Sequence, residues 1–164
     1  MTPFKKILVP IDFSPFSDEV IATAVDLAKR YDGSVTLQHV YEVILYALPD
    51  GSPVFSPFQV AEVKKKLSDG LKAVVEKTVA AGATNIDSQL VEGTPHAAII
   101  GLAEQGNYDL IVMGSHGRTG LQHVLLGSVA ERVVRRSPCP VLIVRGTHAS
   151  TATDAPSPAP AKRS

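Results

Sequence analysis

Two short segments of this chain are wholly apolar, and they constrain the possible fold more than any other feature. One is the run Ile7-Leu8-Val9, and the other is the segment 110–113, LIVM. Apolar runs of this length are typical of strands that are buried on both faces, as in parallel sheets covered by helices on either side. Segments with helical periodicity alternate with strand-like segments along the rest of the chain, so the sequence predicts an α/β fold.

The pattern predicts five strands and four helices within residues 1–145. Strands are expected within 5–12 around the run Ile7-Leu8-Val9, and at 34–40, 85–91, 109–113 and 140–145, and the strand at 85–91 alternates polar and apolar residues as a sheet edge does. Helices are expected from the capping residues Ser14 and Ser17 to Asp32, from Phe58 to Gly82, from Pro95 to Gly106 with Thr94 as its cap, and from Ser128 to Arg136. In the second helix, Val60, Val63, Leu67, Leu71, Val74 and Val75 mark one apolar face.

The order of the strands follows if the two most apolar strands are neighbours at the centre of the sheet. The chain then winds outward through the first three strands and returns to place the last two on the other side. This predicts a single doubly wound parallel five-stranded sheet, order 3-2-1-4-5, with helices on both faces, which is a Rossmann-like fold. A ligand crevice is expected at the carboxyl ends of the first and fourth strands, where the winding reverses.

Composition limits the size of the folded unit and the classes of partner. Hydrophobic residues make up 45% of the 164 residues, which is enough for one core at 1–145. The segment 146–164 is rich in Pro, Ala, Ser and Thr and is expected to be a disordered tail, and the proline-rich stretch 41–57 is expected to be a flexible loop. Lys plus Arg and Asp plus Glu both number 16, so no net charge attracts nucleic acid or anionic lipid.

The cellular location is predicted from features that the sequence lacks. No apolar segment is long enough to span a bilayer, and the N-terminal apolar run is too short for the core of a signal peptide. Cys139 is the only cysteine, so it cannot form an intramolecular disulfide, and no cysteine cluster suggests structural zinc. We therefore expect a soluble cytoplasmic protein without membrane or nucleic-acid partners.

A glycine-rich segment follows the strand predicted at 109–113. Gly114 and Gly117 are followed, after nine residues, by Gly127 and Ser128, in the pattern G-x-x-G-x9-G-S. Glycines let backbone N–H groups approach an anion closely, and the start of a helix offers N–H groups and a dipole that favour phosphate. The alternative is that the glycines only form turns and that Ser128 only caps a helix. Asp12, at the end of the neighbouring central strand, adds to the case for a ligand site.

Three parts of the chain resemble the universal stress protein family over about its first 145 residues. They are KILVPIDFS, LQHV and GNYDLIVMGSHGRTGLQHVLLGSVAERVVRRSPCPVLIVR. In this family the pattern G-x-x-G-x9-G-[ST] marks the members that bind ATP, and the chain matches it in full. The resemblance therefore implies a stress-response or signalling module that binds ATP with Mg²⁺, and a homodimer formed through the last strand.

The resemblance also implies roles for particular residues. The phosphates would be held by Gly114, Gly117, Gly127 and Ser128, with the backbone N–H of Val129 beside them and Met113 and Ser115 lining the loop. Asp12, next to Pro10 and Ile11, would lie near the ribose and Mg²⁺, and the backbone of Val40 would contact the adenine edge. Two alternatives stay open: Asp12 as the cap of the first helix and Val40 as a core residue. His39, His116, Arg118 and His123 are assigned to packing or to the surface.

The motifs that the sequence lacks favour binding over catalysis. There is no Walker segment, no G-x-G-x-x-G fingerprint and no arguable Ser-His-Asp set. One alternative is a slow ATP hydrolase or a nucleotidyl transferase of related fold, with Asp12 as a Mg²⁺ ligand. Another is a nucleotide-free dimeric interaction module in which the strand at 140–145 pairs with its own copy, burying Val141, Leu142 and Ile143.

Overall fold

The computed structural model describes residues 3–42, 56–115 and 126–145. The elements are β1 (Lys6–Pro10), α1 (Ser17–Tyr31), β2 (Ser34–Tyr41), α2 (Pro57–Ala80), β3 (Ile86–Glu92), α3 (Pro95–Gln105), β4 (Leu110–Gly114), α4 (Ser128–Arg136) and β5 (Val141–Val144). The predicted tail, most of the predicted loop 41–57 and much of the glycine-rich segment lie outside the described residues, so the domain boundary at 145 stays a prediction.

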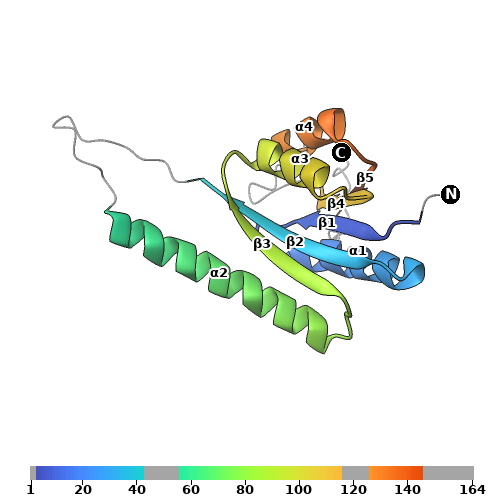
Figure 1. Cartoon of the computed structure of the whole chain (residues 1–164), viewed down its shortest axis with the longest axis horizontal. Coiled ribbons are helices and arrows are strands. Elements are labelled where there is room, and N and C mark those ends of the chain that lie inside the picture. The colour runs from blue at the N-terminus through green and yellow to red at the C-terminus, as the bar shows by residue number, and fades with distance from the viewer. Residues whose placement is uncertain (1–2, 43–55, 116–125, 146–164) are drawn as a thin grey trace, which may run out of the picture.

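The sheet has the predicted topology. Its five strands run in the order β3-β2-β1-β4-β5, every neighbouring pair is parallel, and β3 and β5 form the edges (Figure 1). β1 pairs with β2 from Lys6 opposite Ser34 to Pro10 opposite Gln38. On its other side β1 pairs with β4, with Ile7 opposite Leu110. The doubly wound order is therefore confirmed, with the reversal between β1 and β4.

The two faces of the sheet are covered by different helices (Figure 1). Ile7 and Val9 pack with residues of α1 and with Leu71 of α2, whereas Leu8 packs with residues of α3 and α4. Because successive side chains of a strand point to opposite faces, a strand between two helical layers must be apolar at every position. This explains why β1 and β4 appear in the sequence as unbroken apolar runs.

Three predictions about the helices are wrong in detail. The residue before α1 is Phe16, and neither Ser14 nor Ser17 caps this helix. Thr94 precedes α3, but its side chain makes no capping hydrogen bond, so the fixed φ of Pro95 is left as the start signal. The predicted apolar face of α2 is also only partly buried, since Leu71 is its one buried residue and Val63 is 52% exposed.

The start of α2 is defined by a reciprocal capping box that was not predicted. The Ser56 hydroxyl accepts the backbone N–H of Gln59, and the Gln59 side chain accepts the backbone N–H of Ser56. Such a pair satisfies two N–H groups that a helix start would otherwise leave without partners. Within the described residues, no helix is both long and apolar enough to cross a membrane.

The backbone is closely packed around Gly33, which lies between α1 and β2. A Cβ built on Gly33 would lie 2.7 Å from the carbonyl oxygen of Phe4, whereas on Gly101 of α3 its nearest neighbour would be the Gln105 amide nitrogen at 3.9 Å. We expect Gly33→Ala to lower the free energy of unfolding by about 1–3 kcal/mol because the backbone must move. Gly101→Ala should raise it by about 0.5–1 kcal/mol, since alanine favours a helix interior. Urea unfolding checks both values, and equal stability of the two variants would contradict the proposed close packing.

Candidate functional site

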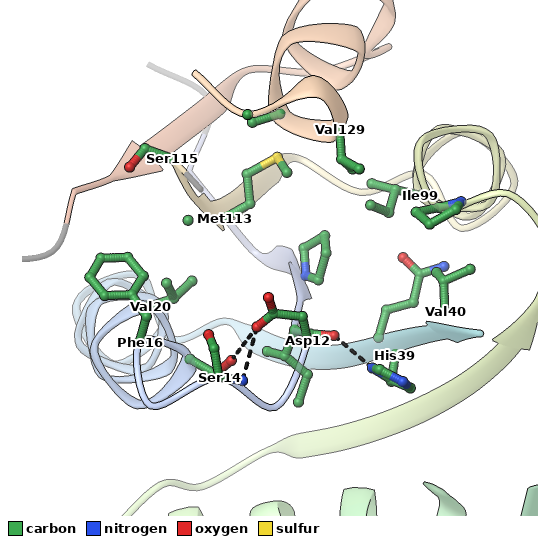
Figure 2. Close-up of a pocket in the computed structure, with 18 of the residues that line it drawn as sticks. Asp12, Ser14, Phe16, Val20, His39, Val40, Ile99, Met113, Ser115 and Val129 are labelled. Atoms are coloured by element: carbon green, nitrogen blue, oxygen red, sulfur yellow. Dashed lines mark hydrogen bonds between the residues drawn. The ribbon is translucent and has the colours of Figure 1, made fainter. Parts of the chain in front are cut away.

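A cavity of about 310 Å³ opens at the carboxyl ends of β1, β2 and β4, where the winding of the sheet reverses (Figure 2). Its wall includes the predicted site residues Pro10, Ile11, Asp12, Val40, Met113, Gly114, Ser115, Gly127, Ser128 and Val129. Gly117, His116, Arg118 and His123 lie outside the described residues. The fold thus gathers on one cavity the predicted residues that it describes.

The two glycine segments meet at this cavity although they are separated in the sequence. The backbone N–H of Gly127 donates to the carbonyl oxygen of Ser115 at 2.8 Å, and Ser115 N donates to Val144 O at 3.0 Å. These bonds fix the start of α4 directly beside the end of β4. Gly127 is the residue before the helix, so Ser128 occupies the first helical position and is not the cap.

The start of α4 gives one end of the cavity an electropositive character. The first intrahelical bond runs from Glu131 N to Gly127 O at 2.9 Å, so the N–H groups of residues 128–130 have no acceptor within the helix. Together with the helix dipole, such groups favour an anion. Val129 and Ala130 line the cavity beside Ser128, which places this helix start at its wall.

Asp12 lies near the middle of the cavity wall (Figure 2). Its Oδ1 accepts hydrogen bonds from the backbone N–H of Ser14 at 3.0 Å and from the Ser17 hydroxyl at 3.2 Å. Its Oδ2 is buried and has no hydrogen-bond partner among the described residues. Asp12 therefore contacts the hydroxyl group of Ser17 in the first turn of α1. It does not cap this helix, because Phe16 is the residue before α1 and no side chain makes a capping hydrogen bond there.

The charge state of Asp12 results from opposing effects. Burial alone raises the pKa of this carboxyl group, but hydrogen bonds from Ser14 and Ser17 together outweigh burial and lower the pKa below its ordinary value. Asp12 is thus held as a carboxylate at neutral pH, with one oxygen occupied by the protein. The other oxygen is available to a hydroxyl group or a cation.

The turn after β1 is fixed by residues to which sequence reasoning gave no role at the site. Phe13 adopts a positive φ of 60°, and its ring lies 4.3 Å from the ring of His39, centroid to centroid. His39 is buried and lines the cavity, and its Nδ1 lies 2.8 Å from the carbonyl oxygen of Ile11. Because a carbonyl only accepts, Nδ1 carries the proton in this contact. These contacts hold the backbone on both sides of Asp12.

The end of the cavity nearest α3 is largely apolar, and Val129 at the start of α4 packs in the same apolar cluster. Its wall there includes Val40 from β2 and Ile99 and Pro95 from α3, while Phe16 and Val20 of α1 line another side. In Figure 2, Val40 and Ile99 lie across the cavity from Ser115, with Asp12 between them. Val40 is half-buried, and it both packs against the apolar core on the α3 and α4 side and borders the cavity, so its two alternative roles stay predictions.

The doubly wound sheet and the cavity at its switch point define an α/β protein of the class that binds ligands at the carboxyl edge of the sheet. The model of the Universal stress protein family matches residues 3–145. The chain therefore belongs to the universal stress protein family. Universal stress protein MJ0531 from Methanocaldococcus jannaschii is 36% identical over 143 residues, which cover 87% of this chain and 82% of that protein.

Solved structures agree with this assignment. The universal stress protein UspA from Lactobacillus plantarum has a TM-score of 0.75 and 27% identity, and the match covers 88% of this chain and all of that one. A universal stress protein solved in complex with cAMP has a TM-score of 0.65 and 27% identity, and the match covers 88% of this chain and 98% of that one. The fold of the family is thus shown for this chain.

Ser17 provides a test of how the charge of Asp12 is maintained. Ser17→Ala removes one hydrogen bond to Oδ1, so we expect the pKa of Asp12 to rise and the free energy of unfolding at pH 7 to fall by about 0.5–1.5 kcal/mol. When folding lowers the pKa of an aspartate, the ionised group stabilises the folded protein at any pH above the pKa of the unfolded aspartate, about 3.9. This stabilisation disappears as the pH falls through the pKa of the folded protein. The stability difference between the two proteins should therefore shrink in acid.

The pKa of Asp12 is measured by ¹³C NMR titration of its carboxyl group, and the stability difference by urea unfolding at pH 7 and pH 3. Thr23→Ala in the same helix is the matched control, because the Thr23 hydroxyl donates to the Glu19 carbonyl on the exposed side of α1. This control should leave the pKa of Asp12 unchanged. A Ser17→Ala protein with an unaltered Asp12 pKa would contradict the role given to this hydrogen bond.

Proposed function

We propose that this protein is a stress-response or signalling module that binds ATP, or another adenine nucleotide, in the cavity at the switch point. The observation that carries this proposal is the convergence of Gly114, Ser115 and the start of α4 on the same cavity as Asp12. The hydrogen bond between Gly127 N and Ser115 O holds the two glycine segments together. The same cavity thus combines N–H donors at a helix start with the half-buried carboxylate of Asp12.

The phosphates are assigned to the end of the cavity at the start of α4. Gly114, Gly127 and Ser128 supply close backbone approach and a hydroxyl group, and the N–H groups of the first helical turn supply donors. Gly117 is assigned to the same group from the sequence pattern. The adenine ring is assigned to the apolar end, where the backbone of Val40 and the side chain of Ile99 border the cavity.

A divalent cation such as Mg²⁺ fits Asp12. The buried Oδ2 of Asp12 is the oxygen for which the described residues provide no partner. Among those same residues no group of three or more His, Cys, Asp or Glu side chains could hold a metal ion without the nucleotide. Mg²⁺ is commonly bound by one or two carboxylates together with substrate phosphates, so a single carboxylate beside a triphosphate is sufficient.

A relative supports an adenine nucleotide as the ligand. The universal stress protein solved with cAMP shares the fold and 27% of its residues with this chain. That complex makes adenine the base to test first, and ATP is preferred among its nucleotides because the chain carries the full G-x-x-G-x9-G-S pattern.

We propose that this protein is located in the cytoplasm. A single cysteine such as Cys139, whose pKa is raised by burial, stays a thiol there.

Substitution of Gly127 tests nucleotide binding. Gly127→Val places a branched side chain next to the proposed phosphate position, so we expect the affinity for ATP with Mg²⁺ to fall at least tenfold while the fold is kept. Isothermal titration calorimetry measures the affinity, and circular dichroism checks the fold. Gly101→Val, on α3 outside the cavity, is the control and should bind ATP as the wild type does.

Three outcomes of these experiments bear on the proposal in different ways. The proposed function is refuted if the wild-type protein binds no adenine nucleotide and if mass spectrometry finds none released from the purified protein. Loss of folded structure in Gly127→Val would assign Gly127 to stability instead. Phosphate release that Asp12→Ala abolishes would favour the alternative of a slow ATP hydrolase.

We also propose that the protein forms a homodimer through β5. This strand is an edge of the sheet, and its central residue Leu142 is 38% exposed, so an apolar surface and unpaired backbone groups lie side by side. Leu142→Arg should shift the protein from dimer to monomer at micromolar concentration, because the charge of the arginine would be buried in the dimer interface. Sedimentation velocity measures the shift, and a wild-type monomer under these conditions would refute the dimer.

A further inference from the structure

Gln38 is a fully buried amide in the wall of the cavity. It lies in β2 between Leu37 and His39, it is paired in register with Pro10, and its exposed fraction is 0%. Its Nε2 donates to the carbonyl oxygen of Ala98 in α3 at 3.1 Å. A polar side chain without any exposure is uncommon in the centre of a parallel sheet, where buried polar groups are normally fully hydrogen-bonded.

The other atom of the amide is not satisfied in this way. A carbonyl only accepts, so the amide nitrogen must face Ala98, and the orientation of the Gln38 side chain is thereby determined. Its Oε1 is then directed away from Ala98, and it has no hydrogen-bond partner among the described residues. Among the described residues, the only other buried side-chain oxygen or nitrogen without a hydrogen-bond partner is Oδ2 of Asp12, and both residues line the same cavity.

Gln38 belongs to the apolar end of the cavity. It precedes His39 and Val40 in the strand, and its hydrogen bond to Ala98 places its amide beside Ile99 in α3. Val40 and Ile99 lie across the cavity from Ser115 in Figure 2, and they pack in the same apolar cluster as Val129 at the start of α4. The side-chain oxygen of Gln38 is thus a buried acceptor behind an otherwise apolar part of the wall, and a small number of polar groups commonly fix the orientation of a ligand and provide specificity.

We infer, on the basis of the proposed function, that Gln38 is a specificity-determining residue and that its Oε1 accepts a hydrogen bond from the exocyclic amino group of adenine. A 6-oxo purine would set a carbonyl oxygen against this oxygen, and two acceptors repel each other. Oε1 is buried in this structure, so the proposed contact requires a change in the side-chain torsions of Gln38 that exposes this oxygen to the cavity. The cavity therefore selects 6-amino purines over 6-oxo purines.

The test compares ATP with inosine triphosphate, which differs in carrying oxygen in place of the 6-amino group. Wild-type protein should bind ATP on the order of tenfold more tightly or better, because a site built to accept from a donor rejects the analogue that lacks it. Gln38→Met keeps the length of the side chain and removes the oxygen, so it should reduce this ratio at least about threefold, the value of one hydrogen bond. Its melting temperature should not fall, since the Ala98 carbonyl lies within α3 and keeps a helical partner.

Gln89→Met is the matched control. Gln89 is paired with Gln38 in the neighbouring strand β3, but its side chain is exposed and lies outside the cavity. The control should keep the wild-type ratio of affinities, as measured by isothermal titration calorimetry with Mg²⁺ present. If Gln38→Met does not fold, two measurements replace it. One is the ratio of affinities in Gln38→Leu, and the other is the affinity of the wild type for purine riboside triphosphate, which has no group at position 6.

The outcomes separate this inference from the proposed function. Wild-type protein that binds neither triphosphate contradicts the proposed function, and this inference fails with it. Protein that binds ATP with the same preference in the wild type and in Gln38→Met overturns the role of Gln38 and leaves nucleotide binding intact. A wild type that binds ATP and purine riboside triphosphate equally overturns it as well, because the oxygen then gains nothing from the amino group.

Discussion

The parallel pairing of β1 with β4 at the centre of the sheet determines where the other elements and the cavity lie. From this pair the chain winds outward in two directions, so the connection after β1 leads to α1 on one face and the chain after β4 leads to α4 on the other. The two connections diverge at the carboxyl edge between these strands, and the described residues leave a cavity there. Asp12 follows β1 and Ser115 follows β4, so the winding itself brings an acid and the Gly114-Ser115 segment to the wall of one cavity.

The residues around this crevice are not arranged for maximal stability. Phe13 is held at a positive φ, and buried oxygens of Asp12 and Gln38 lack partners among the described residues. Each of these features costs free energy of folding, on the order of 1–3 kcal/mol for a strained residue or an unsatisfied buried group. Phe13 directly follows Asp12, and Asp12 and Gln38 line one cavity, whereas the apolar layers on both faces of the sheet provide the burial that offsets these costs. Such grouping is typical of a site that is preorganised for a ligand.

Local signals predicted the elements better than they predicted the element boundaries. The apolar runs of β1 and β4 identified the central strands because two-sided burial leaves no position for a polar residue. The caps assigned to Thr94 and Ser14 were wrong because a side chain that can cap a helix does so only when the chain enters at a suitable angle. The apolar face of α2 was overestimated, since periodicity reports which face is apolar but not how much of it finds a partner.

The parallel sheet, the order of its strands and the glycine pattern were predictable from the amino-acid sequence, since these follow from burial and from backbone freedom along single segments. Three features came from the packing of distant segments: α3 forms one wall of the cavity, His39 contacts the Ile11 carbonyl next to Asp12, and Oε1 of Gln38 has no partner among the described residues. Nothing local distinguishes Gln38 from a polar residue that faces water. Its environment is set by a helix sixty positions further along the chain, and sequence periodicity carries no information about which distant element packs against a given residue.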